Sequence, residues 1–189
     1  WQIITLKVQY IDLFGVILKE EFVDYGSNPN YPENPFIEGY TFIGWDSETI
    51  EVIKDNTIYK AKYSINNYNI IYDLNREQEN DKTTINYNVQ SELITLPKPT
   101  RTGYTFLGWT GSNGLTPQKD ITIPKGSYGD KNYKANWIAN TYKITLNPNK
   151  GTVEPTVINT TYNSLYGILP TPERTGYSFE GWYSGKDKI

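Results

Sequence analysis

The chain has 189 residues and a net charge of −3, and it contains no cysteine, methionine or histidine. These counts exclude a disulfide framework, thiolate zinc sites and the histidine-based arrangements of nucleophilic catalysis. Without a basic stripe, nucleic acid is not expected as a partner. No run approaches the roughly 20 apolar residues of a transmembrane helix, so no membrane insertion is expected.

The first third of the sequence predicts a β-hairpin, a loop and two further strands. Residues 4–10 alternate apolar and polar side chains, which is the pattern of a half-buried strand. Residues 26–38 carry several prolines and are expected to be loop, because proline is excluded from helix interiors. In chain order we expect a strand at 4–10, a turn at 12–15, a strand at 16–25, the loop, an aromatic stretch at 39–45, a polar connection at 46–56 and a closing strand at 57–63.

The same series of elements returns twice. The second series has a charged hairpin tip at 76–82 and a glycine-containing segment at 110–131, which we expect to be an inserted loop. The third series starts at Tyr142 and stops before a closing strand. We therefore expect three units, namely 1–63, 64–137 and 138–189, called units one, two and three below. The incomplete third unit and the absence of an initial methionine suggest a piece of a longer array.

The units share one aromatic motif, Pro-x-x-x-Gly-Tyr-[Thr/Ser]-Phe-x-Gly-Trp. Its glycine-bracketed parts lie at 39–45, 103–109 and 176–182, so that their starts are 64 and 73 residues apart. Three copies of such a motif define a repeat protein. The predicted structural core of the repeats consists of Tyr40, Phe42, Trp45, Tyr104, Phe106, Trp109, Tyr177, Phe179 and Trp182.

The motif also predicts a β-bulge. Strict alternation would place Phe42 and Trp45 on opposite faces of a strand. In the third copy, Glu180 occupies the position of Ile43. This indicates that the strand face carrying this position is exposed to solvent. Because tryptophan carries a large apolar surface, a bulge at the second glycine should return it to the face of the phenylalanine. Short connections between units predict an extended, semi-rigid rod in which neighbouring repeats contact one another.

The motif, its upstream proline and the closing Tyr-x-Ala-x-[Tyr/Trp] strand resemble the Listeria–Bacteroides repeat family, which includes the B repeats of internalin-type proteins. The first half of unit one is also similar to mucin-binding-type repeats. The resemblance implies a mainly β or α+β fold, built from small β-grasp-like (ubiquitin-like) modules with little helix. It further implies an extracellular protein on the surface or cell wall of a Gram-positive bacterium, with no enzyme activity.

The remaining polar groups favour structural roles. Candidate carboxylate pairs are Asp46 with Glu48 and Glu77 with Asp81, together with the single Asp130. None has the surroundings of a catalytic pocket, and the tip at 76–82 lacks the regular spacing of a calcium loop. Solvated loop charge is the favoured interpretation, so no catalytic residue, metal or cofactor is predicted.

Two functions remain open. The first is a spacer that holds a binding domain away from the cell wall. The second is an adhesin whose exposed tyrosines bind host glycoprotein or polysaccharide, since tyrosine is a rigid and amphipathic contact residue. The tyrosines placed on polar faces or loops are Tyr10, Tyr31, Tyr59, Tyr68, Tyr128 and Tyr183, of which Tyr31, Tyr59, Tyr128 and Tyr183 are the candidate ligand contacts. Packing of these rings across the sheet is the alternative explanation.

Overall fold

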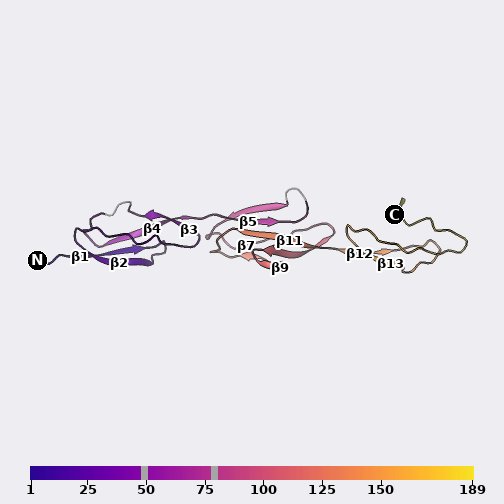
Figure 1. Cartoon of the computed structure of the whole chain (residues 1–189), viewed down its shortest axis with the longest axis horizontal. Helices are drawn as coiled ribbons and strands as arrows, with labels where there is room; N and C mark the ends of the chain where they lie inside the picture. Colours follow the sequence, from indigo (N-terminus) through magenta and orange to yellow (C-terminus); the bar gives the residue numbers. More distant parts are fainter. Residues whose placement is uncertain (48–50, 78–80) are drawn as a thin grey trace.

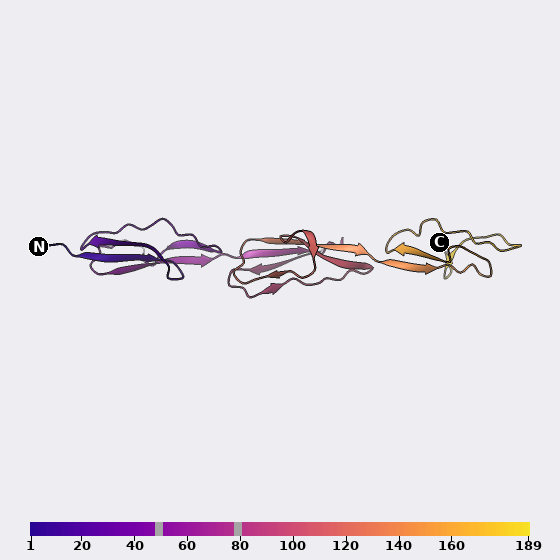
Figure 2. The same ribbon diagram turned by 90° about the horizontal axis from the view of Figure 1, so that it is seen from below.

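A computed structural model describes residues 1–47, 51–77 and 81–189. The described residues form strands, turns and loops and contain no helix. Figures 1 and 2 show an elongated chain in which three groups of elements follow one another along the long axis. The protein is therefore mainly β, and the two termini lie toward opposite ends of the molecule (Figure 2).

Unit one is a four-stranded sheet with the order β2-β1-β4-β3. Its strands are β1 (Thr5–Ile11), β2 (Ile17–Asp24), β3 (Tyr40–Trp45) and β4 (Thr57–Ile65). The central strands β1 and β4 run parallel, and each pairs with an antiparallel neighbour on its outer side. This central parallel pair between two antiparallel neighbours is compatible with the expected β-grasp-like module.

Unit two has the same sheet with one strand added, in the order β6-β5-β11-β8-β9. A separate ribbon pairs β7 with β10. The strands are β5 (Tyr68–Asp73), β6 (Lys82–Tyr87), β7 (Ile94–Thr95), β8 (Tyr104–Gly111), β9 (Gly114–Gln118), β10 (Thr122–Ile123) and β11 (Lys131–Ala139). Strands β5 and β11 are parallel, as β1 and β4 are in unit one.

The segment 110–131 is more than the inserted loop predicted from its glycines. It completes β8, adds β9 to the sheet edge and supplies β10. It also places Ile121 and Ile123 in the core of unit two, where they are 6% and 2% exposed. The prediction was wrong because the two buried isoleucines, rather than the glycines, decide where this segment packs.

Unit three has only short two-stranded pairings among its described residues. Strand β12 (Thr141–Thr145) pairs with β13 (Val157–Thr161), and β14 (Tyr183–Ser184) pairs with β15 (Asp187–Lys188). The aromatic motif at 176–182 forms no strand here. In the other units the motif strands β3 and β8 pair with β4 and β11, and the described part of unit three contains no strand in that position.

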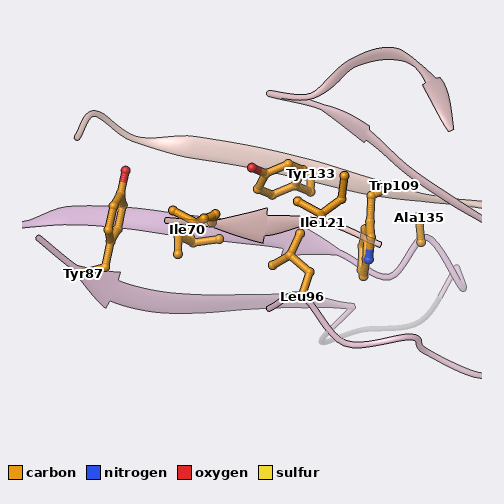
Figure 3. Close-up of a cluster of buried hydrophobic side chains, with 8 residues drawn as sticks. Ile70, Tyr87, Leu96, Trp109, Ile121, Tyr133 and Ala135 are labelled. Atoms are coloured by element: carbon orange, nitrogen blue, oxygen red, sulfur yellow. The ribbon is translucent and has the colours of Figure 1, made fainter. Parts of the chain in front are cut away.

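The first two units have separate cores. The core of unit one contains Val8, Tyr10, Trp45, Ile53, Tyr59 and Ala61. The core of unit two contains Ile70, Tyr87, Leu96, Trp109, Ile121, Ile123, Tyr133 and Ala135. In Figure 3 the labelled side chains of unit two fill the space between the sheet strands and the segment that carries Leu96. Trp45 and Trp109 thus belong to two separate clusters of buried residues.

The predicted bulge is present in both sheets. The pairing of β3 with β4 passes from Phe42 to Gly44, and the pairing of β8 with β11 passes from Phe106 to Gly108. The second glycines Gly44 and Gly108 have φ values of 126° and 138°, a region that side chains rarely enter. The extra residue turns the tryptophan back to the phenylalanine face.

Candidate functional site

The aromatic motif builds one recurring contact, an edge-on packing of phenylalanine against tryptophan. The ring centroids lie 5.6 Å apart for Phe42 and Trp45, and 5.4 Å apart for Phe106 and Trp109. The same pair in unit three, Phe179 with Trp182, lies 5.5 Å apart although no strand forms there. The motif therefore forms this phenylalanine–tryptophan contact even where it is not part of a sheet.

A second recurring contact anchors the tryptophan to the proline-containing lead-in. The indole Nε1 of Trp109 donates a hydrogen bond to the carbonyl of Pro97 at 3.0 Å. The indole of Trp182 donates to the carbonyl of Pro170 at 2.9 Å. This bond pairs the one polar atom of a buried indole, which would otherwise be costly to bury. The sequence motif includes the prolines Pro99 and Pro172. It gave no signal that the residues two positions earlier, Pro97 and Pro170, accept the hydrogen bond of the indole.

The nine predicted core residues do not share one environment. Trp109 is completely buried, Trp45 is 8% exposed, and Tyr40, Phe42, Tyr104 and Phe106 are half-buried beside them. In unit three, Trp182 is only half-buried, while Tyr177 and Phe179 are 68% and 42% exposed. The core prediction is thus corrected for Tyr177 and Phe179, which no strand covers in the described part of unit three.

The candidate ligand-contact tyrosines fall into two groups. Tyr59 is 5% exposed, and its ring stacks on the ring of Tyr10 at 5.3 Å. Tyr31 is half-buried, stacks on Trp45 at 5.5 Å and donates its hydroxyl to the carbonyl of Ser47 at 2.8 Å. The prediction of exposed positions was therefore wrong for Tyr59, Tyr10 and Tyr31. The rings of Tyr10 and Tyr31 pack against Trp45, and the ring of Tyr59 packs against those two tyrosines. Strand alternation alone does not reveal these contacts.

Tyr128 and Tyr183 are the two candidates that stay on the surface, with exposed fractions of 45% and 53%. Tyr128 also reaches the neighbouring unit, because its side chain hydrogen-bonds Glu38, and this bond raises the pKa of Tyr128 above its usual value. Tyr68, also considered from the sequence, is half-buried and packs on Tyr87. Among the candidates, only Tyr183 is exposed without a described contact to another unit.

The carboxylates singled out from the sequence have structural partners. Asp46 accepts a hydrogen bond from the backbone N–H of Lys60, and Asp130 accepts one from the backbone N–H of Asn69. Asp81 accepts from the backbone N–H and the guanidinium of Arg76, which closes the charged hairpin tip. Glu48 lies outside the described residues. Over the described ranges, no group of three or more acidic residues is arranged to hold a metal ion.

The junctions between units repeat one another in detail. At the first junction, the N–H of Asn66 donates to the carbonyl of Gly39, and the hydroxyl of Thr41 donates to the side-chain oxygen of Asn66. At the second junction, Asn140 makes the same two bonds with Gly103 and Thr105, with lengths of 2.8 Å and 2.7 Å. Asparagine thus fixes the backbone at the point where one unit passes into the next.

In units one and two, a side chain of the following unit packs on the first glycine of the motif. A Cβ placed on Gly39 would lie 2.1 Å from Val89, and one on Gly103 would lie 2.2 Å from the ring of Tyr162. Val89 and Tyr162 each follow the second strand of their unit. Tyr162 further contacts Tyr104 edge-on at 5.5 Å, and Arg101 lies over the Tyr104 ring at 3.9 Å. The motif therefore serves both the interior of its own unit and the contact with the next unit.

Comparison with known proteins shows which family has this series of repeats. The model of the Listeria-Bacteroides repeat domain matches residues 7–65, 68–135 and 142–188. The chain belongs to the Listeria-Bacteroides repeat family. The three matched ranges begin and end close to the sheet boundaries described above, and together they cover most of the chain.

Curated relatives carry the same repeats within longer chains. A protein named as a Gly-rich membrane protein of Evansella cellulosilytica is 30% identical over 98% of this chain and 22% of its own length. A second membrane protein of that organism is 28% identical over 97% of this chain and 28% of its own length. Internalin H of Listeria monocytogenes is 31% identical over 63% of this chain and 20% of its own length. The chain thus spans less than a third of these relatives.

Among solved structures, that of Mub-RV aligns with 70% of this chain and 98% of its own chain, at 14% identity and a TM-score of 0.19. This score is too low to support a structural argument. Over the described residues, no helix has the length and apolar character needed to cross a membrane.

Proposed function

We propose that this chain is a non-catalytic spacer in an extracellular protein at the bacterial cell surface, where it holds another part of the protein away from the cell. The observation that supports this most directly is the repetition of the junction. Both junctions use an asparagine bonded to the motif glycine and a side chain packed on that glycine. A connection that is hydrogen-bonded and packed resists bending better than a flexible linker does.

The relatives support the location. Two of them are named as membrane proteins and a third is Internalin H. Repeats in such proteins occupy a part of a much longer chain, which suits a segment that sets distance. The separate cores suit the same role, because each unit is stabilised by its own buried rings rather than by a shared interior.

The spacer proposal requires stiff junctions, and paired spin labels test this. The chain has no cysteine, so cysteines introduced at the exposed positions Lys54 and Lys119 would label units one and two without background. Thr84 and Lys119, both in unit two, form the control pair. We expect a distance distribution between units that is nearly as narrow as the control. A distribution several times broader would contradict the spacer.

An adhesive role is the second candidate, and the surface of unit three favours it. Tyr183 is 53% exposed and borders a hollow of about 660 Å³ that Tyr177, Phe179 and Trp182 also line. Exposed rings beside polar groups can stack on sugar rings, so host glycoprotein or polysaccharide is the ligand class of this alternative. Binding of the purified chain to mucin or to an arrayed glycan, lost in Tyr183→Ala and retained in Leu115→Ala, would favour adhesion over the spacer.

A further inference from the structure

The covalent connections between the units run through the central strands of the sheets. Strand β4 ends at Ile65 and β5 begins at Tyr68. Strand β11 ends at Ala139 and β12 begins at Thr141. The chain therefore enters unit one by β1 and leaves it by β4, and it enters unit two by β5 and leaves it by β11. These strands lie along the long axis of the molecule (Figures 1 and 2), so that tension along the chain acts along the strands themselves.

The entering and leaving strands of each of these two units are direct neighbours in the sheet. The parallel pairing joins residues 8–11 of β1 to residues 57–60 of β4, and residues 70–73 of β5 to residues 131–134 of β11. Because the two strands of a pair point the same way, a pull on the start of one and the end of the other slides them past each other. In this shear geometry the evenly spaced hydrogen bonds of a parallel pair share the load, whereas in peeling they break one after another.

A side chain adds one further hydrogen bond to each parallel pair, at the same position in both units. In unit one, the backbone N–H of Lys7 donates to the side-chain oxygen of Asn56 at 2.8 Å. In unit two, the backbone N–H of Asn69 donates to the carboxylate of Asp130 at 2.8 Å. Each acceptor directly precedes the closing strand, and each donor directly precedes the first residue that pairs with that strand. We call this bond the rung, because it extends each parallel ladder by one step.

Aromatic rings cover one face of the parallel pairs. Tyr10 and Tyr59 lie opposite each other in the register, are both buried, and stack with ring centroids 5.3 Å apart. Tyr72 and Tyr133 lie opposite each other in unit two, where Tyr133 is buried. A hydrogen bond shielded from water is stronger than an exposed one. The bonds that join the entering and leaving strands are therefore placed where they resist breakage best.

We propose that units one and two are tensile clamps, which carry tension along the chain by shear of the parallel pairs β1/β4 and β5/β11. The load passes from β1 across hydrogen bonds to β4, continues through the covalent chain into β5, and crosses to β11. The antiparallel strands and the loops stay outside this path. The clamp rests on the proposed spacer for the source of the tension. The spin-label distances report bending at the junctions rather than resistance to pulling, so either proposal can fail alone.

The direction of pulling tests the clamp in the complete chain. The chain has no cysteine, so cysteines that replace the exposed residues Ile4 and Ser64 attach handles that pull β1 and β4 in shear. Ile4→Cys with Asp55→Cys places both handles at the same end of the pair and peels it. We expect the unfolding force in optical tweezers to be about twofold higher or more in shear than in peeling, because several bonds share the load. Urea midpoints of both variants correct for effects of the substitutions on stability. Equal forces in the two directions would overturn the proposal.

Substitution of the rung tests the same load path in unit two. Handles at Asn67 and Thr141, which flank its strands and are exposed, pull β5 and β11 in shear. Asp130→Ala should lower the unfolding force, whereas Asp130→Asn should retain it, because Asn56 makes the same bond in unit one. Asp120→Ala removes an exposed carboxylate outside both strands and should leave the force unchanged. If Asp130→Ala unfolds at the same force as Asp130→Asn, the rung bears no load and its part in the clamp is refuted.

Discussion

The sharpest prediction concerns Trp109, the largest completely buried side chain among the described residues. Its ring contacts Phe106 at 5.4 Å and Tyr72 at 5.7 Å, and its indole bonds the carbonyl of Pro97. Replacing a buried tryptophan by alanine costs about 3–5 kcal/mol, and the unpaired carbonyl adds about 1 kcal/mol. A sheet and core of this size are stable by about 4–11 kcal/mol. Trp109→Ala should therefore remove most of the stability of unit two.

Hydrogen exchange measured at increasing urea concentrations tests this prediction, because it reports the stability of each unit separately. In Trp109→Ala, protection of β5, β8 and β11 should be lost at a much lower urea concentration, while β1 and β4 should keep theirs. The matched control is Leu115→Ala, because Leu115 is 95% exposed on β9. If Trp109→Ala and Leu115→Ala denature at the same urea concentration, the assignment of Trp109 to the core is refuted.

Three further predictions follow from single contacts. Gly103→Ala should loosen the second junction, seen as faster exchange at Tyr162, whereas Gly176→Ala, with open space around it, should leave Tyr162 unchanged. Burial raises the pKa of Tyr87 from 10.0 to about 12; the unfolded chain therefore ionises first, and stability should fall as pH rises from about 10 to 12. Urea midpoints at pH 8 and 11 should differ less in Tyr87→Phe, and an equal difference would contradict this. Tyr59→Ala should lower the melting temperature of unit one, measured by circular dichroism, and an unchanged melt would show that this ring is not a core contact.

Much of the local structure could be predicted from the motif. The glycine-bracketed pattern implied a bulge, because a phenylalanine and a tryptophan three residues apart cannot share one face of a regular strand. The closing strands were predicted from alternation, and β4 and β11 lie where the pattern placed them. These features depend on neighbours in sequence, so sequence carries them.

The errors have a common physical cause. The glycines of segment 110–131 led to the prediction of a loop, and the polar neighbours of Tyr59 led to the prediction that its ring is exposed. Both conclusions ignored which elements cover the open face of the sheet. Ile121 packs with Leu96, about 25 residues away in the chain, and Tyr31 from the long loop stacks on Trp45. Such contacts join segments that are far apart in the sequence. The alternation pattern within one strand does not reveal which distant segment will pack on it.

The sequence by itself determined the three repeats, the bulged aromatic motif and the strands around it, because these features follow from glycine conformation and from alternation over a few residues. Only the tertiary structure decided which rings are buried and how asparagine and glycine join the units. Burial depends on a second surface that arrives from elsewhere in the chain. The aromatic motif is therefore fully buried at Trp109, where Leu96, Ile121 and Ile123 join its cluster from other segments.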